Sequence, residues 1–501
     1  MEFPGPLLDI SLRTSSRCYS SRPDSSATAT LPRPRLNYRE ISETVVFKSH
    51  NAFNRNAPLP AGAIQTIAKL YQTKKDLTDA LNPRIHTRST IGERIRQNAK
   101  DPDAKKAALE DAKVLKAEIT ELEQKLLEVE DRMFHLALAV PNDTHPDTPI
   151  GPESTAVTLS EYGPPPIPAS PSRDHVSVGR TLKLLDLEAG ATVTGSSWYY
   201  LLNEGALLEM ALTNYALSIA TKHGFTPVTT PDVIRADIAY RCGYQARDPQ
   251  GETPASQMYH IANTTARDTT GGSPSSPELV LAGTAEIPLA GMFANKIFLP
   301  QELPAKIVGL GRAFRAEAGA RGTDTRGLYR VHQFTKLELF VVSTQDQSEA
   351  MMEELRSVQT EIYSGLGLTF RVLDMPTEEL GASAYRKYDM EAWMPGRARW
   401  GEISSTSNCT DYQARRLHIR YRRPVSLPSD TTVQEQQSKS PSLPFVHTLN
   451  GTAAAIPRLI VALLENGARF DDAGEVVGIN LPKILRPFWV DGRNRTLVNW
   501  V

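Results

Sequence analysis

The chain has 501 residues, which is enough for a large hydrophobic core and two or three domains, and no segment is long and apolar enough to cross a membrane. Its formal net charge of −1 at pH 7 excludes a general attraction to nucleic acid, so binding of that kind requires local basic patches. The three cysteines, Cys18, Cys242 and Cys409, form no CxxC pair, which argues against a disulfide scaffold and a thiolate zinc site and favours a reducing compartment.

Residues 1–36 differ in composition from the rest of the chain. They are rich in Ser, Thr and Arg and poor in acidic residues. This composition is typical of a mitochondrial transit peptide, and the sequence Arg17-Cys18-Tyr19-Ser20 resembles a matrix-processing site. A disordered N-terminal tail is the alternative. We therefore expect the protein to act in the mitochondrial matrix, with the cytoplasm as the alternative location.

Residues 37–140 predict a helical arm. A short helix and a turn are expected over 37–60, followed by two long helices, because Asp101-Pro102-Asp103 is a turn and a helix start. In the second helix, apolar residues recur in alternating steps of four and three, the spacing of a coiled-coil seam: Ala108, Ala112, Leu115, Ile119, Leu122, Leu126, Val129, Met133, Leu136 and Val140. We expect an antiparallel hairpin kinked near Pro83. The seam alone leaves a dimerising coiled coil open.

Residues 141–175 are rich in proline and predict a linker to a domain over 176–487, with a tail over 488–501. Within the domain, helices are expected at 207–219, 352–367 and 456–465, a short strand at 225–234, and strand character over 401–423. Residues 263–278 and 426–443 read as long surface loops. Because the strands occur in hairpin contexts rather than βαβ units, the fold class is α+β, with a largely antiparallel sheet.

Residues 314–340, FRAEAGARGTDTRGLYRVHQFTKLELF, predict two strands joined by a long connection rich in Gly and Arg. Alternation places Arg315 and Glu317 on one face of the first strand. In the second strand it places charged and aromatic residues together on one face: Arg330, His332, Phe334, Lys336 and Glu338. A sheet face of this kind indicates a bound group that is charged and planar.

Five short stretches carry the candidate chemistry: TAE (284–286), RAE (315–317), Phe334 with Glu338, EISS (402–405), and NGT (450–452) followed by Arg458. Guanidinium groups bind phosphate oxygens through two hydrogen bonds, and carboxylates hold Mg²⁺ or an ammonium group. This set of side chains suits an amino acid beside a nucleoside triphosphate. Neither a GxxxxGK[ST] loop nor a GxGxxG helix start is present, so other common phosphate sites are unsupported.

With these stretches in this order, the chain resembles the class II seryl-tRNA synthetases, and their organellar branch in particular. The resemblance covers about residues 60–487 and includes three motifs: the helix and strand ending at Pro231, the hairpin over 314–340, and HTLNGTAAAIPRLIVALLE (447–465). It implies an antiparallel sheet flanked by helices and preceded by an N-terminal coiled-coil arm. It also implies a homodimer, with the first motif at the interface.

For the amino-acid side of the site, the resemblance implies that Thr284, Ala285 and Glu286 line a serine pocket, with Glu286 facing the ammonium group. Glu338 accepts a hydrogen bond from the serine hydroxyl, which would reject alanine, because a buried carboxylate without its partner is unfavourable. Thr452 helps to hold the substrate, in a position where many relatives have serine. Arg315 also contacts the bound carboxylate.

For the nucleotide side, the resemblance implies that Arg315 holds the α-phosphate, Glu317 contacts the adenine side and Arg458 holds the γ-phosphate. Arg315, Arg458 and Glu402 would carry catalysis, and Glu402 would hold Mg²⁺ through ATP. The complete set of residues that it assigns to ATP is Arg315, Ala316, Glu317, Val331, Phe334, Glu402, Ile403, Ser404, Ser405 and Arg458. No zinc site is expected.

The function implied is activation of L-serine by MgATP to seryl-adenylate, followed by transfer of serine to the 3′ end of tRNA(Ser), which the arm would recognise. Basic arm residues available for phosphates are Lys69, Lys74, Lys75, Arg88, Arg94, Arg96, Lys105 and Lys106. The alternatives are a synthetase-like paralogue that loads a carrier protein, or one that binds tRNA without catalysis. The second would be expected to lack Arg315, Glu338, Glu402 or Arg458, and all four are present.

Overall fold

The computed structural model describes residues 31–97, 101–244, 257–262, 277–317, 326–423, 443–490 and 497–501. The chain divides into two units, Met1–Pro32 and Arg33–Val501, and the elements below belong to the second. Most of the predicted transit peptide, with its processing site, and most of the two predicted loops at 263–278 and 426–443 lie outside the described residues. Residues 33–36, which we assigned to the transit peptide, belong to the second unit. Within the described part, no helix has the length and apolar character needed to cross a membrane.

The N-terminal part of the second unit is helical. Helices α1 (Tyr38–Glu43) and α2 (Val45–Asn54) precede two long helices, α3 (Ala63–Gln97) and α4 (Pro102–Leu138). Asp101 caps α4, because its carboxylate accepts hydrogen bonds from the N–H groups of the first turn and Pro102 occupies a position that needs no N–H donor. The predicted restart of the helix at this point is confirmed.

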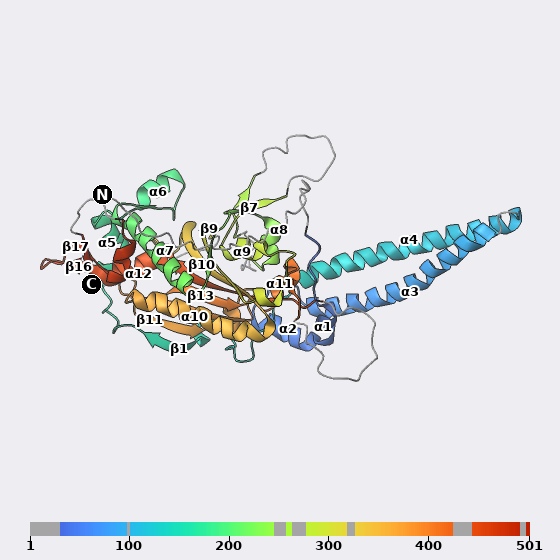
Figure 1. Ribbon diagram of the computed structural model, residues 1–501, viewed down its shortest axis with the longest axis horizontal. Coiled ribbons are helices and arrows are strands. Elements are labelled where there is room, and N and C mark those ends of the chain that lie inside the picture. The colour runs from blue at the N-terminus through green and yellow to red at the C-terminus, as the bar shows by residue number, and fades with distance from the viewer. Residues whose placement is uncertain are drawn as a thin grey trace, which may run out of the picture. The chain divides into compact units, whose positions relative to one another are not determined.

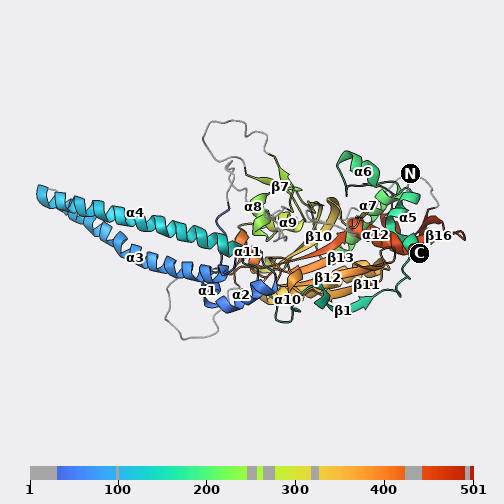
Figure 2. The same cartoon turned by 180° about the vertical axis from the view of Figure 1, so that it is seen from behind.

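Helices α3 and α4 lie side by side as an antiparallel hairpin (Figures 1 and 2). Every residue of the predicted seam in α4 is buried or partly buried, and ion pairs cross between the helices at Arg84–Glu118 and Lys74–Glu130. The seam of α4 therefore packs on α3 of the same chain. The helix assignment runs without a break through Pro83, where we expected a kink.

The base of the hairpin has a core of its own. Its buried residues are Ile41, Ile64, Ile67, Met133, Ala137 and Val140. Arg55, at the end of α2, donates hydrogen bonds to the carbonyl oxygens of Asn142 and Ala384 at 3.0 and 2.9 Å. These contacts join the arm to the rest of the unit.

An eight-stranded sheet forms the centre of the larger domain. In spatial order its strands are β1 (Val157–Tyr162), β11 (Phe370–Asp374), β12 (Arg386–Met394), β13 (Arg399–Asn408), β15 (His447–Ala455), β10 (Gln333–Ser343), β9 (Ala305–Phe314) and β4 (Thr226–Thr229). All neighbours pair antiparallel except β4 and β9. The predicted α+β class with an antiparallel sheet is confirmed.

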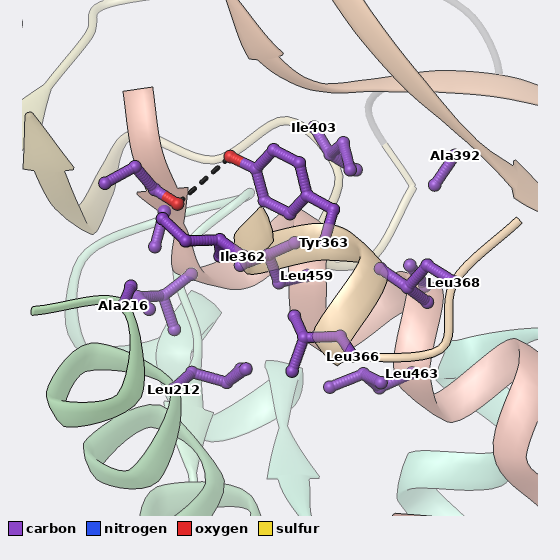
Figure 3. Close-up of a cluster of buried hydrophobic side chains, with 14 of the residues drawn as sticks. Leu212, Ala216, Ile362, Tyr363, Leu366, Leu368, Ala392, Ile403, Leu459 and Leu463 are labelled. Atoms are coloured by element: carbon purple, nitrogen blue, oxygen red, sulfur yellow. Dashed lines mark hydrogen bonds between the residues drawn. The ribbon is translucent and has the colours of Figure 1, made fainter. Parts of the chain in front are cut away.

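One face of this sheet is covered by helices. Helices α7 (Glu204–Lys222), α10 (Ser348–Gly365) and α12 (Ile456–Gly467) pack against it, and their apolar residues meet those of the strands in one large core. Figure 3 shows part of this core, with Leu212 from α7, Ile362 from α10 and Leu459 from α12. Within it, the Tyr363 hydroxyl donates to the carbonyl oxygens of Thr452 and Ala453. Tyr363 therefore ties α10 to β15.

Shorter elements complete the unit. The remaining helices are α5 (His175–Thr181), α6 (Leu187–Val193), α8 (Ala236–Arg241), α9 (Glu286–Met292) and α11 (Tyr412–Leu417). The small sheets consist of β2 (Leu185–Asp186) with β3 (Tyr200–Leu201); β5 (Val233–Arg235), β7 (Leu279–Leu281) and β6 (His260–Ile261); β14 (Arg420–Tyr421) with β8 (Ile297–Phe298); and β16 (Ala468–Phe470), β17 (Val476–Leu481) and β18 (Val498–Trp500). Single turns of 3₁₀ helix occur at Glu153–Thr155, Pro171–Arg173, Pro300–Glu302, Gln345–Gln347 and Thr377–Glu379, and a longer one at Lys483–Phe488.

Three segments differ from their sequence-based description. Residues 141–175 are more than a linker, because β1 lies within them and pairs with β11 at the edge of the main sheet. Residues 488–501 are more than a tail, because β18 adds a parallel strand to β17. The predicted strand over 401–423 ends at Asn408, and α11 follows. For β1 and β18, pairing with a strand distant in sequence decided the structure, and local composition does not contain that information.

Candidate active site

The face of the sheet opposite α7, α10 and α12 borders a cavity of about 1550 Å³. Strands β10, β12, β13 and β15, the start of α9 and the first turn of α12 contribute to its wall. The predicted site residues that line it are Thr284, Glu286, Arg315, Glu317, Glu338, Glu402, Ser405 and Arg458. Five stretches that are far apart in sequence therefore meet in one cavity, as the resemblance implies.

One end of the cavity combines acidic and basic side chains that are almost fully buried. Lys336 Nζ lies 2.7 Å from Glu338 Oε2, on the same face of β10, and donates a hydrogen bond to Thr284 Oγ1 at 3.2 Å. Glu338 is 1% exposed and Lys336 is 8% exposed. Because burying a carboxylate without a partner is costly, the ion pair with Lys336 stabilises Glu338 in this position. Lys336 thus contacts both Glu338 and Thr284, two of the residues expected to bind the amino acid.

Glu286 lies at the same end, in the first turn of α9, and Gln413 donates to its Oε1 at 2.6 Å. Burial raises the pKa of Glu286 to about 7, and the negative charge of Glu338 contributes in the same direction. An ammonium group entering here would reverse this effect, because an opposite charge favours the ionised carboxylate. This end of the cavity is therefore electrostatically suited to a cation.

Arg315 and Glu317 follow β9 instead of lying on it, because the strand ends at Phe314. Arg315 remains aligned with the hairpin, since its N–H donates to the His332 carbonyl at 2.9 Å, and its guanidinium lies 5.3 Å from the centre of the Phe334 ring. Glu317 has a φ of +47° and forms an ion pair with Arg330 at 3.2 Å. The predicted shared strand face is wrong here, although both side chains reach the cavity.

The other end of the cavity is organised by Arg458 and Glu402. Arg458 Nη1 donates to Glu402 Oε2 at 2.9 Å and to the Glu402 carbonyl at 3.0 Å, and its Nε donates to the Tyr329 carbonyl at 3.3 Å. Burial opposes ionisation of Glu402, but the charge of Arg458 outweighs it, so the pKa of Glu402 is lowered. Arg458, whose own pKa is raised, therefore holds a fixed positive charge in this wall.

A β-bulge explains why EISS contributes only part of its length to the cavity. In the pairing of β12 with β13, Met390 pairs with Ser404 and Glu391 pairs with Glu402, so Ile403 is an extra residue. Strict alternation would place Glu402 and Ser405 on opposite faces; the extra residue brings both to the cavity and turns Ile403 into the core. The bulge therefore decides which side chains of this stretch reach a ligand.

The other predicted residues lie around the cavity without lining it. Ala285, Val331, Ile403, Ser404 and Thr452 are buried, and the Arg315 guanidinium lies over the ring of Phe334. Ala316 is held by its backbone, since its N–H donates to the Gln257 carbonyl. Ser404 donates to the Thr452 carbonyl at 2.7 Å. The structure does not place the side chains of these residues in the cavity, and their roles stay predictions.

Sequence reasoning missed several residues of the cavity wall. Lys387, Asp389 and Glu391 alternate along β12 and pair with Ser407, Ser405 and Glu402 of β13. Burial raises the pKa of Asp389, opposed by Lys387, whose Nζ lies 2.6 Å away, and reinforced by the charge of Glu402. The alternation in RKYDMEAWM was the available signal. Asn450, from the predicted NGT stretch, and Tyr244 also line the cavity, and no local pattern marks Tyr244.

The cavity and one further cluster are relevant to metal binding. Carboxylates of Asp389, Glu391 and Glu402 line the cavity together. The pKa of Asp389 is raised mainly by burial, and the charges of Glu402 and Glu391 act in the same direction. Oxygen ligands of this type suit Mg²⁺. Among the described residues, Asp174, His175 and Glu465 bring potential ligand atoms within 4.8 Å of one another. In that cluster His175 and Glu465 already hydrogen-bond to each other and to backbone N–H groups, so we assign it a structural role.

Known proteins with similar sequences share one description. A family model described as the class II tRNA synthetase core domain (G, H, P, S and T) matches residues 270–467. A serine--tRNA ligase of Treponema denticola is 39% identical over 456 residues, covering 90% of this chain and 98% of that protein. A mitochondrial serine--tRNA ligase of Schizosaccharomyces pombe is 40% identical, covering 90% and 88%, and that of Saccharomyces cerevisiae is 37% identical, covering 91% and 95%.

Solved structures agree with the sequence relatives. Seryl-tRNA synthetase from Pyrococcus horikoshii complexed with ATP superimposes with a TM-score of 0.76 at 31% identity, covering 90% of this chain and 98% of that one. The cytoplasmic serine-tRNA ligase of Naegleria fowleri in complex with AMP gives a TM-score of 0.72 at 25% identity, covering 91% and 97%. Both similarities extend over the arm as well as the sheet domain.

Proposed function

We propose a mechanism from the premise that the chain belongs to the class II seryl-tRNA synthetase family, as its relatives at about 40% identity over nearly their whole length show. Its reaction joins serine to tRNA: L-serine and ATP form seryl-adenylate and pyrophosphate, and serine then passes to the 3′ end of tRNA(Ser) with release of AMP. The observation that carries the assignment of roles is the single cavity in which Arg315 and Arg458 face buried carboxylates.

Serine binds at the end formed by Thr284, Glu286 and Glu338. Its ammonium group pairs with Glu286, and its hydroxyl donates to Glu338, which also forms an ion pair with Lys336. Ala285, directly before α9, and Thr452, in β15, shape this end through their backbones. An alanine in the same place would leave Glu338 with an unused buried acceptor, which sites of this kind reject by a factor of about 10⁴ or more.

ATP binds between the two arginines. Phe334 and Val331 support the adenine region, and Glu317 and the backbone of Ala316 lie at its edge. Arg315 holds the α-phosphate, and Arg458 holds the γ-phosphate; Ile403 and Ser404 support this end from the core side, and Ser405 faces the phosphates. The serine carboxylate attacks the α-phosphorus, the bond to the bridging oxygen breaks and pyrophosphate leaves, so no general base is required. Fixed positive charge stabilises the developing negative charge.

Magnesium fits the carboxylate set on the cavity floor. Glu402 is the residue that we assign to it, acting with the phosphates of ATP, and Asp389 and Glu391 add negative charge beside it. When bound, the ion would neutralise phosphate charge and orient pyrophosphate as the leaving group. Glu402 also orients Arg458, through the hydrogen bond at 2.9 Å.

The arm supplies tRNA binding, and a second subunit completes the enzyme. Lys69, Lys105 and Lys106 are exposed on the hairpin, whereas Lys74 is paired with Glu130. We assign tRNA phosphates to the unpaired set. Residues 37–140 then form the tRNA-binding arm, and residues 176–487 the catalytic domain.

Exposed apolar residues near α7, among them Val193, Tyr200 and Met210, support a homodimer interface.

We place the protein in the mitochondrial matrix. The basic, hydroxyl-rich composition of residues 1–36 supports this location, and so do the mitochondrial relatives from two fungi. Because bacterial relatives are equally similar, the assignment to the organellar type depends on the composition of residues 1–36. A cytoplasmic enzyme is the alternative.

Aminoacylation tests the function directly. Purified protein is incubated with ATP, Mg²⁺, radiolabelled serine and either a tRNA(Ser) or a leucine tRNA, which also has a long variable arm. Charging of tRNA(Ser) alone is expected. Serine activation without charging of any tRNA would point to a carrier-protein ligase, and ATP binding without activation would point to a paralogue that binds tRNA but does not catalyse.

A further inference from the structure

A buried histidine outside the cavity is hydrogen-bonded to Leu328, and the next two residues, Tyr329 and Arg330, line the cavity. His175, in the first turn of α5, is 1% exposed, and its Nε2 accepts a hydrogen bond from the Leu328 N–H at 3.2 Å. Its Nδ1 lies 2.8 Å from Oε1 of Glu465 in α12. Because Nε2 is an acceptor, the ring proton is on Nδ1 and is donated to Glu465, which selects one neutral tautomer.

The same glutamate holds a second segment of the wall. Glu465 Oε2 accepts hydrogen bonds from the N–H groups of Gly396 and Arg397, at 2.8 and 3.1 Å, in the turn between β12 and β13. Glu465 is fully buried. One carboxylate therefore fixes both the imidazole of His175 and the turn that carries Arg397.

Close packing at Gly327 restricts the position of Leu328 further. Gly327 has a φ of +70°, which disfavours any side chain, and a Cβ there would lie 2.2 Å from His175 Nε2. The imidazole thus fills the space in which a side chain of residue 327 would stand. His175 therefore restrains the backbone in two ways, through the hydrogen bond from Leu328 and through its packing against Gly327.

The next residue reaches the catalytic arginine. The Tyr329 carbonyl accepts the hydrogen bond from Arg458 Nε, at 3.3 Å. The centre of the Tyr329 ring lies 4.8 Å from the guanidinium carbon of Arg458 and 3.8 Å from that of Arg397. A shift of the backbone at Leu328 would move Tyr329 and with it two of the groups that orient Arg458.

We propose that His175 is a positioning residue for the ATP end of the site. Held by Glu465, it fixes the backbone at Leu328 through its Nε2 and so sets the place of Tyr329 and Arg458. His175 does not line the cavity, and among the residues that the structure describes no hydrogen-bonded path of this kind leads from it to Glu286 or Glu338. This inference rests on the proposed role of Arg458. It adds that ATP binding by Arg458 depends on the hydrogen bond that the His175 imidazole accepts from Leu328.

Two substitutions of His175 separate its two hydrogen bonds. In His175→Gln, the amide oxygen stands near the position of Nε2 and can accept from Leu328. In His175→Asn, the shorter amide stands near Nδ1 and keeps the bond to Glu465 but cannot reach Leu328. The matched control is His223→Asn, because His223 forms a similar pair with Glu361, at 2.6 Å, away from the cavity.

The dissociation constant of ATP is measured by calorimetric titration without serine, and the Michaelis constants of ATP and serine are measured by pyrophosphate exchange. His175→Asn is expected to weaken ATP binding about three- to tenfold, the range for one lost hydrogen bond. His175→Gln and His223→Asn should stay within about twofold of wild type by the same measure, and the Michaelis constant of serine should not change. Equal ATP affinity in His175→Asn and wild type, or equal defects in the two His175 variants, would overturn the proposal.

Gly327→Ala provides an independent variant if His175→Asn does not fold. Its added Cβ displaces the imidazole, so it should weaken ATP binding while leaving the Michaelis constant of serine unchanged; a folded Gly327→Ala protein with normal ATP affinity contradicts the proposal. Failure of the proposed function is distinguishable: a wild-type protein that binds ATP but shows no serine-dependent exchange refutes that function, and the titrations still test His175.

Discussion

Arg458 is the residue on which the nucleotide end of the site depends most. Its guanidinium is fixed by Glu402 and by the Tyr329 carbonyl, so it needs no rearrangement when phosphate binds. We expect Arg458→Ala to lower serine-dependent pyrophosphate exchange about 10²- to 10³-fold, the usual cost of removing one preorganised donor. Arg458→Lys should be intermediate, because an ammonium group cannot reproduce both hydrogen bonds.

The control for this substitution is Arg180→Ala, since Arg180 forms an exposed ion pair with Glu188 and neither residue lines the cavity. It should exchange like wild type. An Arg458→Ala enzyme within a few-fold of wild type would show that another group binds the γ-phosphate.

Glu286 makes serine binding depend on pH. Its pKa is about 7 in the empty site, raised mainly by burial and further by Glu338. Below that pH the carboxyl is protonated and cannot pair with an ammonium group, so serine affinity should fall as pH decreases from 8 to 6. Exchange kinetics at fixed ATP should show this as a rise in the Michaelis constant of serine with one inflection near pH 7.

Glu286→Gln removes this titration and tests its origin. The variant should bind serine weakly at every pH, without the inflection. An inflection that persists in Glu286→Gln would assign it to another group, such as Asp389, whose pKa is also raised.

At the residue scale, sequence identified which types of side chain would meet but not every orientation. Arg315, Glu338, Glu402 and Arg458 reach the cavity as predicted. The positions of Ile403 and Ser404 depend on a bulge opposite Met390 and Glu391, and the roles of Lys387 and Asp389 depend on pairing between β12 and β13. Such register is fixed by contacts between strands, which a single sequence does not state.

At the scale of elements, a partial deletion of the arm separates tRNA binding from serine activation better than deletion of the whole arm. Residues 62–140 include Ile64, Ile67 and Met133 of the base core, so their removal would expose Ile41. A shorter deletion removes residues 75–129 and joins the two helices by a flexible linker beside the Lys74–Glu130 ion pair. The base core then stays intact.

This shortened protein should activate serine normally but charge tRNA poorly. Pyrophosphate exchange is expected within about twofold of wild type, because no removed residue lines the cavity, whereas the Michaelis constant of tRNA should rise at least about tenfold through the loss of phosphate contacts. Equal loss of both activities in a folded protein would contradict the separation of roles.

Elements with a strong local period were predictable, and those defined by distant partners were not. The seam of α4 was readable because ten residues repeat the same spacing. In contrast, β1 lies in a proline-rich stretch and exists because β11 offers an edge, with Val157 paired to Asp374. The tail strand β18 depends in the same way on β17.

At the scale of the whole molecule, the proposed organellar role and homodimer make separate predictions. Native protein from isolated mitochondria should begin after the Arg17–Ser20 segment, and a chain beginning at Met1 would contradict a cleaved transit peptide. Sedimentation of the purified protein should give about twice the chain mass of 55.2 kDa. A single-chain mass in an active enzyme would refute the dimer.

The central property proposed for this protein is selective activation of serine in the cavity of the sheet domain. Its most direct test is ATP–pyrophosphate exchange on the purified full-length protein with serine, threonine, alanine or glycine as the amino acid. We expect exchange with serine and essentially none with the others, because only serine places a hydroxyl on Glu338 without an additional methyl group. Exchange that is equal for alanine and serine, or absent with all four in a folded protein that binds ATP, would contradict it.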